Sequence, residues 1–126
     1  MTGEQILVVE DNEKNMKLFR DVLVATGYRT LEATTGGEAV DMASEHTPDL
    51  VLMDIQLPDL DGVQALHRLR ANERTATIPV LALTAQAMQG DRERFLAAGF
   101  DDYVSKPVNV RDLIATVRDH CDRRAR

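Results

Sequence analysis

The sequence predicts a single α/β domain in which a doubly wound parallel sheet of five strands lies between two layers of helices. Three observations favour this class. Short apolar runs recur along the chain, and several are nearly continuous in Val, Leu and Ile, as in strands buried on both faces. Amphipathic stretches separate these runs. Strand and helix alternate about five times, which is typical of an open sheet with right-handed crossovers.

The predicted elements follow from these runs and from the residues that can start or stop a helix. The strands are ILVV at 6–9, RTLEA at 29–33, LVLM at 50–53, PVLAL at 79–83 and YVS at 103–105. The helices span residues 13–26, 37–46, 63–72, 86–99 and 110–121. Asn12 can cap the first helix, Gly27 can end it, and Asn109 can cap the last. Gly90 costs the fourth helix about 1 kcal/mol relative to alanine, so we expect a weak start there.

The composition fits one globular domain with no linker and no output domain. Hydrophobic residues make up 44% of the chain and charged residues 29%, and the net charge of −6 makes nucleic acid a poor partner. No apolar run approaches the roughly 20 residues of a membrane span, and the N-terminus lacks the features of a signal peptide. We therefore expect residues 1–126 to form one domain of a soluble cytoplasmic protein.

Several polar residues predict no further site. His46, His67 and His120 are far apart in the sequence, so we expect surface histidines. Cys121 is the single cysteine, which excludes an internal disulfide, and we expect a surface or half-buried thiol. The tail at 118–126 mixes basic and acidic residues, which favours a solvated helix end over a nucleic-acid arm.

Polar residues stand at the carboxyl ends of four predicted strands. Glu10 and Asp11 follow the first strand, and Asp54 ends the third. Thr84 follows the fourth strand and Lys106 follows the fifth. Ligands of doubly wound sheets bind outside the carboxyl ends of the strands. If these four strands are neighbours, the five side chains converge on one pocket.

These residue types suit phosphoryl acceptance. Three carboxylates in one pocket repel each other, and a bound divalent cation offsets that repulsion. Oxygen ligands with room for water favour Mg²⁺, or Mn²⁺, over softer metals. A carboxylate beside the ion can attack phosphorus and form an aspartyl phosphate, which makes Asp54 the candidate acceptor. Lys106 supplies positive charge and Thr84 a hydroxyl for the phosphoryl oxygens.

Each of these residues has an ordinary interpretation when it is taken alone. Asp54 could be a turn residue, and Thr84 could be a helix cap. Five such residues at successive strand ends outweigh those interpretations. The proline and glycine of the segment 57–62 then turn the chain away from the pocket and leave it open. This explains why a buried strand ends on a carboxylate.

At this point the chain resembles a known family, the receiver domain of two-component response regulators. The resemblance covers essentially the whole chain and rests on four motifs: ILVVEDN at 6–12, LMDIQLPDLDG at 52–62, LALTA at 81–85 and SKP at 105–107. Longer strings are similar to the DivK type of single-domain receiver, at 10–19, 53–58 and 84–91. The family implies a flavodoxin-like receiver fold, a three-layer αβα arrangement with strand order 2-1-3-4-5.

The resemblance assigns the acids to phosphorylation and metal binding. Asp54 would accept the phosphoryl group from a histidine kinase or a histidine phosphotransferase. Asp11, Asp54 and the backbone carbonyl of Gln56 would bind Mg²⁺ directly. Glu10 would hold a metal-bound water, and many relatives have aspartate at its position.

The resemblance also implies a phosphoryl-binding set and a switch. Thr84 and Lys106 would hold the phosphoryl oxygens, and the small Ala85 would leave room for the donor imidazole. The Lys106–Pro107 bond would be cis. An added charge of about −1.5 to −2 would draw Thr84 toward the phosphoryl group and turn Tyr103 inward, which changes the surface of the fourth helix, fifth strand and fifth helix. Tyr103 could instead be a plain edge residue.

Two assignments stay open. Gln56 and Gln86 either tune the hydrolysis of the acyl phosphate, as these positions do in the family, or are solvated loop residues. Leu18 lies off the apolar stripe of the first helix. It either widens the core face or belongs, with the loop 107–109, to a kinase-docking surface.

Three other functions fit parts of the pattern. A phosphatase of the haloacid dehalogenase type needs an acid two residues after its nucleophile, where this chain has Gln56. A flavodoxin-like cofactor carrier needs a phosphate-binding loop, and neither a GxGxxG nor a Walker pattern is present. A degenerate receiver would serve only as a binding module, which the intact Asp54, Thr84 and Lys106 oppose. We therefore predict a single-domain response regulator that accepts phosphate stoichiometrically and acts through protein contacts, rather than an ordinary enzyme.

Overall fold

The computed structural model describes residues 3–57, 59, 61–84 and 91–125. In these residues, five strands form one parallel sheet in the order β2-β1-β3-β4-β5. The strands are β1 (Gln5–Val9), β2 (Arg29–Ala33), β3 (Leu50–Asp54), β4 (Val80–Thr84) and β5 (Asp102–Ser105). The helices are α1 (Glu13–Thr26), α2 (Gly36–His46), α3 (Gly62–Ala71), α4 (Asp91–Ala98) and α5 (Val110–Ala125). The predicted fold class and strand order are confirmed.

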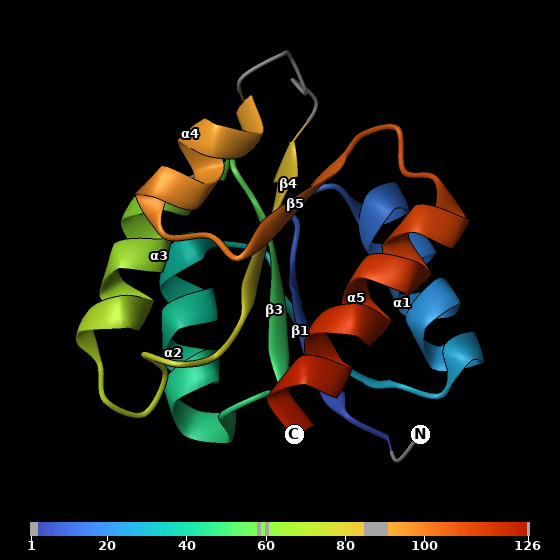
Figure 1. The fold of residues 1–126 in the computed structure, drawn as a ribbon, viewed down its shortest axis with the longest axis horizontal. Helices are drawn as coiled ribbons and strands as arrows, with labels where there is room; N and C mark the ends of the chain where they lie inside the picture. Colours follow the sequence, from blue (N-terminus) through green and yellow to red (C-terminus); the bar gives the residue numbers. More distant parts are fainter. Residues whose placement is uncertain (1–2, 58, 60, 85–90, 126) are drawn as a thin grey trace.

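The helices cover the sheet in two layers (Figure 1). α1 and α5 pack on one face through a core cluster that includes Phe19 and Leu113. α2, α3 and α4 cover the other face through a cluster that includes Leu66 and Phe95. The strands β3 and β4 are buried along their whole lengths, as the nearly continuous apolar runs predict.

Local sequence sets the limits of α1. The Oδ1 atom of Asn12 accepts hydrogen bonds from the backbone N–H groups of Lys14 at 2.9 Å and Asn15 at 3.1 Å. Gly27 follows the helix in the left-handed region at φ 106°, which glycine adopts without steric cost. Asn109 caps α5 through its side chain in the same way as Asn12 caps α1. These three helix signals are confirmed.

Other helix limits differ from the prediction. α2 and α3 each begin one residue earlier, because Thr35 and Asp61 cap them. α5 continues past the predicted end to Ala125. The predicted start of the fourth helix, which includes Gly90, lies outside the described residues, and α4 is described from Asp91.

The packing of α5 corrects two predictions. His120 is 8% exposed and Cys121 is 2% exposed, so neither is a surface group. Helical spacing carries both residues onto the buried face that Val117 already turns toward the sheet. The Nε2 atom of His120 lies 3.2 Å from Oδ2 of Asp102, which satisfies the buried ring.

Three surface residues test the remaining predictions. His46 and His67 are exposed, as predicted. Leu18 is 39% exposed, so the interpretation that it widens the core face is wrong.

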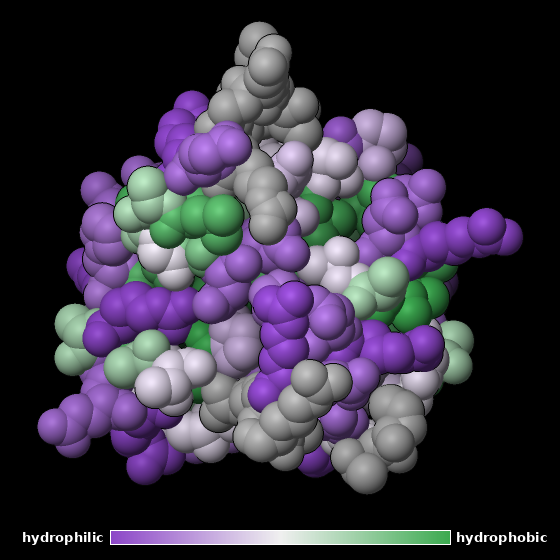
Figure 2. All heavy atoms as spheres, in the orientation of Figure 1, coloured by the Kyte–Doolittle hydropathy of each residue, from purple (hydrophilic) through white to green (hydrophobic). Residues whose placement is uncertain are grey.

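Figure 2 shows one face of the molecule on which most residues are hydrophilic and hydrophobic ones appear in small patches, one of them over α4. Within the described ranges, the length and hydropathy of the helices exclude a membrane span.

Candidate functional site

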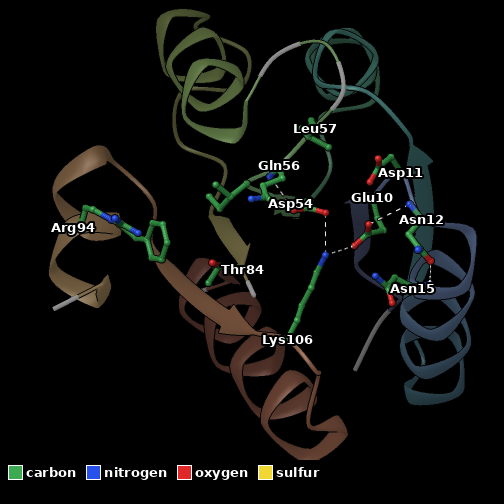
Figure 3. A pocket seen from close by; sticks show the side chains of 12 residues that line it. Glu10, Asp11, Asn12, Asn15, Asp54, Gln56, Leu57, Thr84, Arg94 and Lys106 are labelled. Atoms are coloured by element: carbon green, nitrogen blue, oxygen red, sulfur yellow. Dashed lines mark hydrogen bonds and ion pairs between the residues drawn. The ribbon is translucent and has the colours of Figure 1, made fainter. Parts of the chain in front are cut away.

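The residues predicted from the strand ends meet at one edge of the sheet. β1, β3, β4 and β5 are neighbours, so their carboxyl ends open on a common cavity of about 520 Å³. The cavity is lined by Glu10, Asp11, Asn12, Asn15, Asp54, Ile55, Gln56, Leu57, Thr84, Arg94, Phe95 and Lys106. Figure 3 shows the polar side chains of this set around the pocket. The predicted convergence of five strand-end residues is confirmed.

Three acids form the negative part of the site. One carboxylate oxygen from each of Glu10, Asp11 and Asp54 lies within 4.8 Å of the others. Glu10 is 1% exposed and Asp54 is 6% exposed, whereas Asp11 is exposed at the mouth. Two of the acids are therefore largely removed from water, which makes their mutual repulsion strong.

Lys106 lies between the two buried acids. Its Nζ donates hydrogen bonds to Oε1 of Glu10 at 2.8 Å and to Oδ2 of Asp54 at 2.9 Å (Figure 3). Burial raises the pKa of Glu10, and the charge of Asp54 adds to this, although the hydrogen bond from Lys106 opposes it. Burial lowers the pKa of Lys106, but its hydrogen bonds to the two carboxylates outweigh burial and raise it overall. Lys106 therefore keeps its proton at neutral pH.

Backbone groups fix the orientation of the carboxylates. The N–H of Gln56 donates to Oδ1 of Asp54 at 2.9 Å, and the N–H of Asn12 donates to Oε2 of Glu10 at 3.2 Å. The chain then passes close behind Asp54 at Gly62. A Cβ atom on Gly62 would lie 2.8 Å from the carbonyl oxygen of Asp54, so this close approach requires glycine. Both acids are held before any ligand arrives.

Of the remaining predicted residues that the structure describes, Thr84 lines the pocket, whereas Tyr103 and Pro107 are not part of its lining. Thr84 is 6% exposed at the end of β4, and its carbonyl accepts a hydrogen bond from the N–H of Lys106 at 2.7 Å. The Lys106–Pro107 peptide bond is cis, as predicted. Tyr103 is half-buried, with its ring centroid 5.8 Å from that of Phe95. The predicted Ala85 and Gln86 lie outside the described residues.

The pocket is also lined by two residues that the sequence did not identify as candidate site residues. Asn15 comes from the first turn of α1, and the spacing of three residues from the cap Asn12 could have revealed it. Arg94 comes from α4, with its guanidinium 5.0 Å from the ring centroid of Phe95 (Figure 3). No local pattern separates Arg94 from a solvated helix residue, because its place at the pocket depends on how α4 packs.

The donor set fits a hard divalent cation. The three acids offer oxygen ligands, and the carbonyl of Gln56 follows Asp54 in the same loop. Lys106 neutralises one negative charge of this cluster, so excess negative charge remains to attract a cation. The prediction of magnesium agrees with this geometry.

Comparison with known proteins gives the family. The sequence matches the response regulator receiver domain over residues 6–118. The chain belongs to this family. The receiver is 48% identical over 117 residues to the polar-differentiation response regulator DivK of Brucella ovis, covering 93% of this chain and 95% of that relative.

Solved structures agree with the receiver fold. The receiver domain of sensor histidine kinase PA1611 from Pseudomonas aeruginosa has a TM-score of 0.88 and 40% identity, over 96% of this chain and 99% of that one. That structure has a magnesium ion coordinated in its active site cleft. A response regulator from Chloroflexus aurantiacus has a TM-score of 0.90 and 30% identity, with 96% and 99% coverage. The receiver is thus a component of two-component signalling.

Proposed function

We propose that this chain is a stand-alone response regulator that accepts a phosphoryl group on Asp54. The observation that carries the proposal is the buried Asp54 carboxylate, held at the end of β3 within reach of Lys106 and facing a cavity with two further acids. The donor is the phosphohistidine of a histidine kinase or of a histidine phosphotransferase. Similarity to DivK along 95% of that relative supports a receiver that functions without an output domain.

The chemistry exchanges one bond to phosphorus for another. An oxygen of the Asp54 carboxylate forms a bond to phosphorus, the phosphorus–nitrogen bond of phosphohistidine breaks, and the imidazole leaves with the electron pair. Lys106, which now donates to Asp54, turns its donors to a phosphoryl oxygen as the negative charge moves there. The hydroxyl of Thr84 donates to another oxygen.

The acids of the pocket would hold the cation. Asp11, Asp54 and the carbonyl of Gln56 would bind Mg²⁺ directly, and Glu10 would hold one of its waters. When bound, the ion supplies positive charge that reduces the repulsion between Asp54 and the incoming phosphoryl oxygens. Arg94 adds a second protein cation at the rim of the same cavity.

Phosphorylation then changes a surface. The added charge of about −1.5 to −2 draws Thr84 toward the site, and the half-buried ring of Tyr103 moves further inward. Tyr103 already contacts Phe95 of α4, so its movement is transmitted to the face formed by α4, β5 and α5. A downstream protein recognises that face. The exposed Leu18 on α1 and the loop 107–109 contribute to docking of the kinase.

The output is a protein contact in the cytoplasm. The receiver either relays its phosphoryl group onward or regulates a kinase by binding to it. Gln56, which is exposed beside Asp54, and Gln86 set how long the acyl phosphate lasts before hydrolysis. Dephosphorylation of Gln56→Ala and Gln86→Ala, followed by mass spectrometry, should show altered lifetimes, and lifetimes equal to the wild type would contradict this role.

Intact mass after incubation with Mg²⁺ and acetyl phosphate tests the proposed function. We expect one added phosphoryl group on the wild type, none on Asp54→Asn, and none when a chelator removes the ion. An adduct that persists in Asp54→Asn would contradict Asp54 as the acceptor. No adduct on a folded wild type would indicate a binding module that does not use phosphorylation.

A further inference from the structure

The loop between β3 and α3 carries an acid that the phosphoryl chemistry does not use. Asp59 is exposed, yet its side chain reaches another element. Its Oδ1 accepts a hydrogen bond from the N–H of Gly36 at 2.7 Å, and its Oδ2 accepts one from the N–H of Gly37 at 2.9 Å. Both amides belong to the first turn of α2, where N–H groups have no partner within the helix. The negative carboxylate also meets the positive end of the helix dipole.

This contact adds to a cap that α2 already has. The hydroxyl of Thr35 accepts a hydrogen bond from the N–H of Glu38 at 3.1 Å, which is an ordinary N-cap. Gly37 leaves space for the second oxygen of the Asp59 carboxylate, because a Cβ there would lie only 3.1 Å from Oδ2 of Asp59. The Asp59 hydrogen bonds therefore connect the β3–α3 loop to α2, whereas Thr35 provides the cap that starts the helix.

The other end of the same loop is tied to the reacting carboxylate. The N–H of Gly62 donates to the carbonyl of Ile55 at 2.8 Å, which closes the base of the loop. The N–H of Gln56 donates to Oδ1 of Asp54 at 2.9 Å. The loop thus has one attachment at the site and one at α2, and the carbonyl of Gln56 lies between them in sequence.

We propose that Asp59 is a positioning residue that holds the β3–α3 loop in the arrangement that binds the divalent cation. Through the same hydrogen bonds, the stability of the first turn of α2 depends on whether the site holds the cation. Coupling between two sites is reciprocal, so a cation that orders the loop also strengthens the hydrogen bonds from Gly36 and Gly37. The inference rests on the proposed function for its importance, since the cation and the phosphoryl group share one pocket.

A pair of variants separates this role from simple helix capping. Asp59→Asn keeps the size of the side chain but has one acceptor oxygen for two N–H groups, so one hydrogen bond and the charge are lost. Thr35→Ala removes the other cap of α2 and leaves the loop untouched. For the wild type and both variants, calorimetric titration measures Mg²⁺ affinity. Chemical denaturation measures the loss of stability, and hydrogen exchange of the Gly36 and Gly37 amides is followed with and without Mg²⁺.

We expect Asp59→Asn to weaken Mg²⁺ binding about fivefold, equivalent to about 1 kcal/mol. Thr35→Ala should lose at least as much stability and keep the wild-type affinity. Mg²⁺ should slow exchange at Gly36 and Gly37 in the wild type and not in Asp59→Asn. Three results would overturn the inference. Asp59→Asn could bind Mg²⁺ as tightly as the wild type, or Thr35→Ala could weaken Mg²⁺ binding as much as Asp59→Asn does. Hydrogen exchange at Gly36 and Gly37 of the wild type could also be the same with and without Mg²⁺. These titrations contain no phosphoryl donor, so a failure of Asp54 to be phosphorylated would overturn the proposed function and leave this result standing.

Discussion

At the site, the positive charge of Lys106 offsets the negative charges of Glu10 and Asp54. Lys106 contacts both buried acids, and its hydrogen bonds satisfy oxygens that have little access to water. Burial still raises the pKa of Glu10 despite this contact. Because the cluster places three acids around Lys106, the pocket remains short of positive charge, and a divalent cation supplies what Lys106 alone does not.

The first residue-scale prediction concerns Mg²⁺ and Asp11. Mg²⁺ at about 100 times its Kd should stabilise the wild type by about 2.7 kcal/mol, because it binds only the folded state. Asp11→Asn should lose most of this gain, since Asp11 is exposed and its replacement leaves the core intact. Urea denaturation with and without Mg²⁺ measures both. Glu13→Gln, an exposed acid on α1, is the control and should respond to Mg²⁺ like the wild type.

The second residue-scale prediction concerns pH in the absence of metal. The folded-state pKa of Glu10 is raised above its ordinary value of 4.5, so this group contributes stability that is fully present below that value. The contribution is lost as the pH rises through the raised pKa. Glu10→Gln should therefore show a smaller decrease in the free energy of unfolding over this interval than the wild type. Equal pH profiles from denaturation in chelator would contradict the assignment.

The third residue-scale prediction concerns Gly62. A Cβ there would meet the carbonyl oxygen of Asp54 at 2.8 Å and the Cα of Ile55 at 2.9 Å, and neither backbone atom can move freely. We expect Gly62→Ala to cost about 1–3 kcal/mol of stability and to slow phosphorylation, because the strain falls on Asp54, the proposed acceptor. Gln64→Ala, at an exposed position of the same helix, should change neither. Denaturation and intact mass measure the two effects.

At the scale of elements, Arg70 near the end of α3 joins three segments at the edge of the sheet opposite the pocket. Its guanidinium donates to the carbonyls of Ala76 at 3.1 Å and Ile78 at 2.7 Å, before β4. It also donates to the carbonyl of Gly99 at 3.2 Å and to Asp101 at 2.9 Å, before β5. Two loops and a helix are therefore held by one side chain.

Removing the Arg70 guanidinium should lower the stability of the fold without slowing phosphorylation. Arg70→Met keeps much of the side-chain volume but leaves carbonyls without a charged donor, so we expect a loss of about 2–3 kcal/mol. The rate of phosphorylation on Asp54 should stay near the wild-type value, because the anchor lies at the other edge of the sheet. Arg68→Met, exposed on the same helix, provides the matched control. A phosphorylation defect in Arg70→Met with unchanged stability would contradict this division.

For the whole molecule, the parts that sequence predicts are those fixed by local chemistry. Asn12 and Gly27 set the limits of α1 because a cap and a left-handed glycine act on adjacent residues. Asp54 and Lys106 could be placed together because parallel strands end at one edge. His120 could not be placed, since its burial depends on how α5 packs against the sheet and on Asp102 from another element. Arg94 could not be predicted as a pocket residue for the same reason, because packing alone brings α4 to the pocket.

The position of Lys106 also has a consequence for the life of the protein in a cell. The site carries its own positive charge between Glu10 and Asp54, so the acids are partly balanced as soon as the chain folds. We therefore expect the chain to fold without a bound ion. The supply of free magnesium then decides when the molecule can respond to a signal, and a bound ion adds stability to a chain that is already folded.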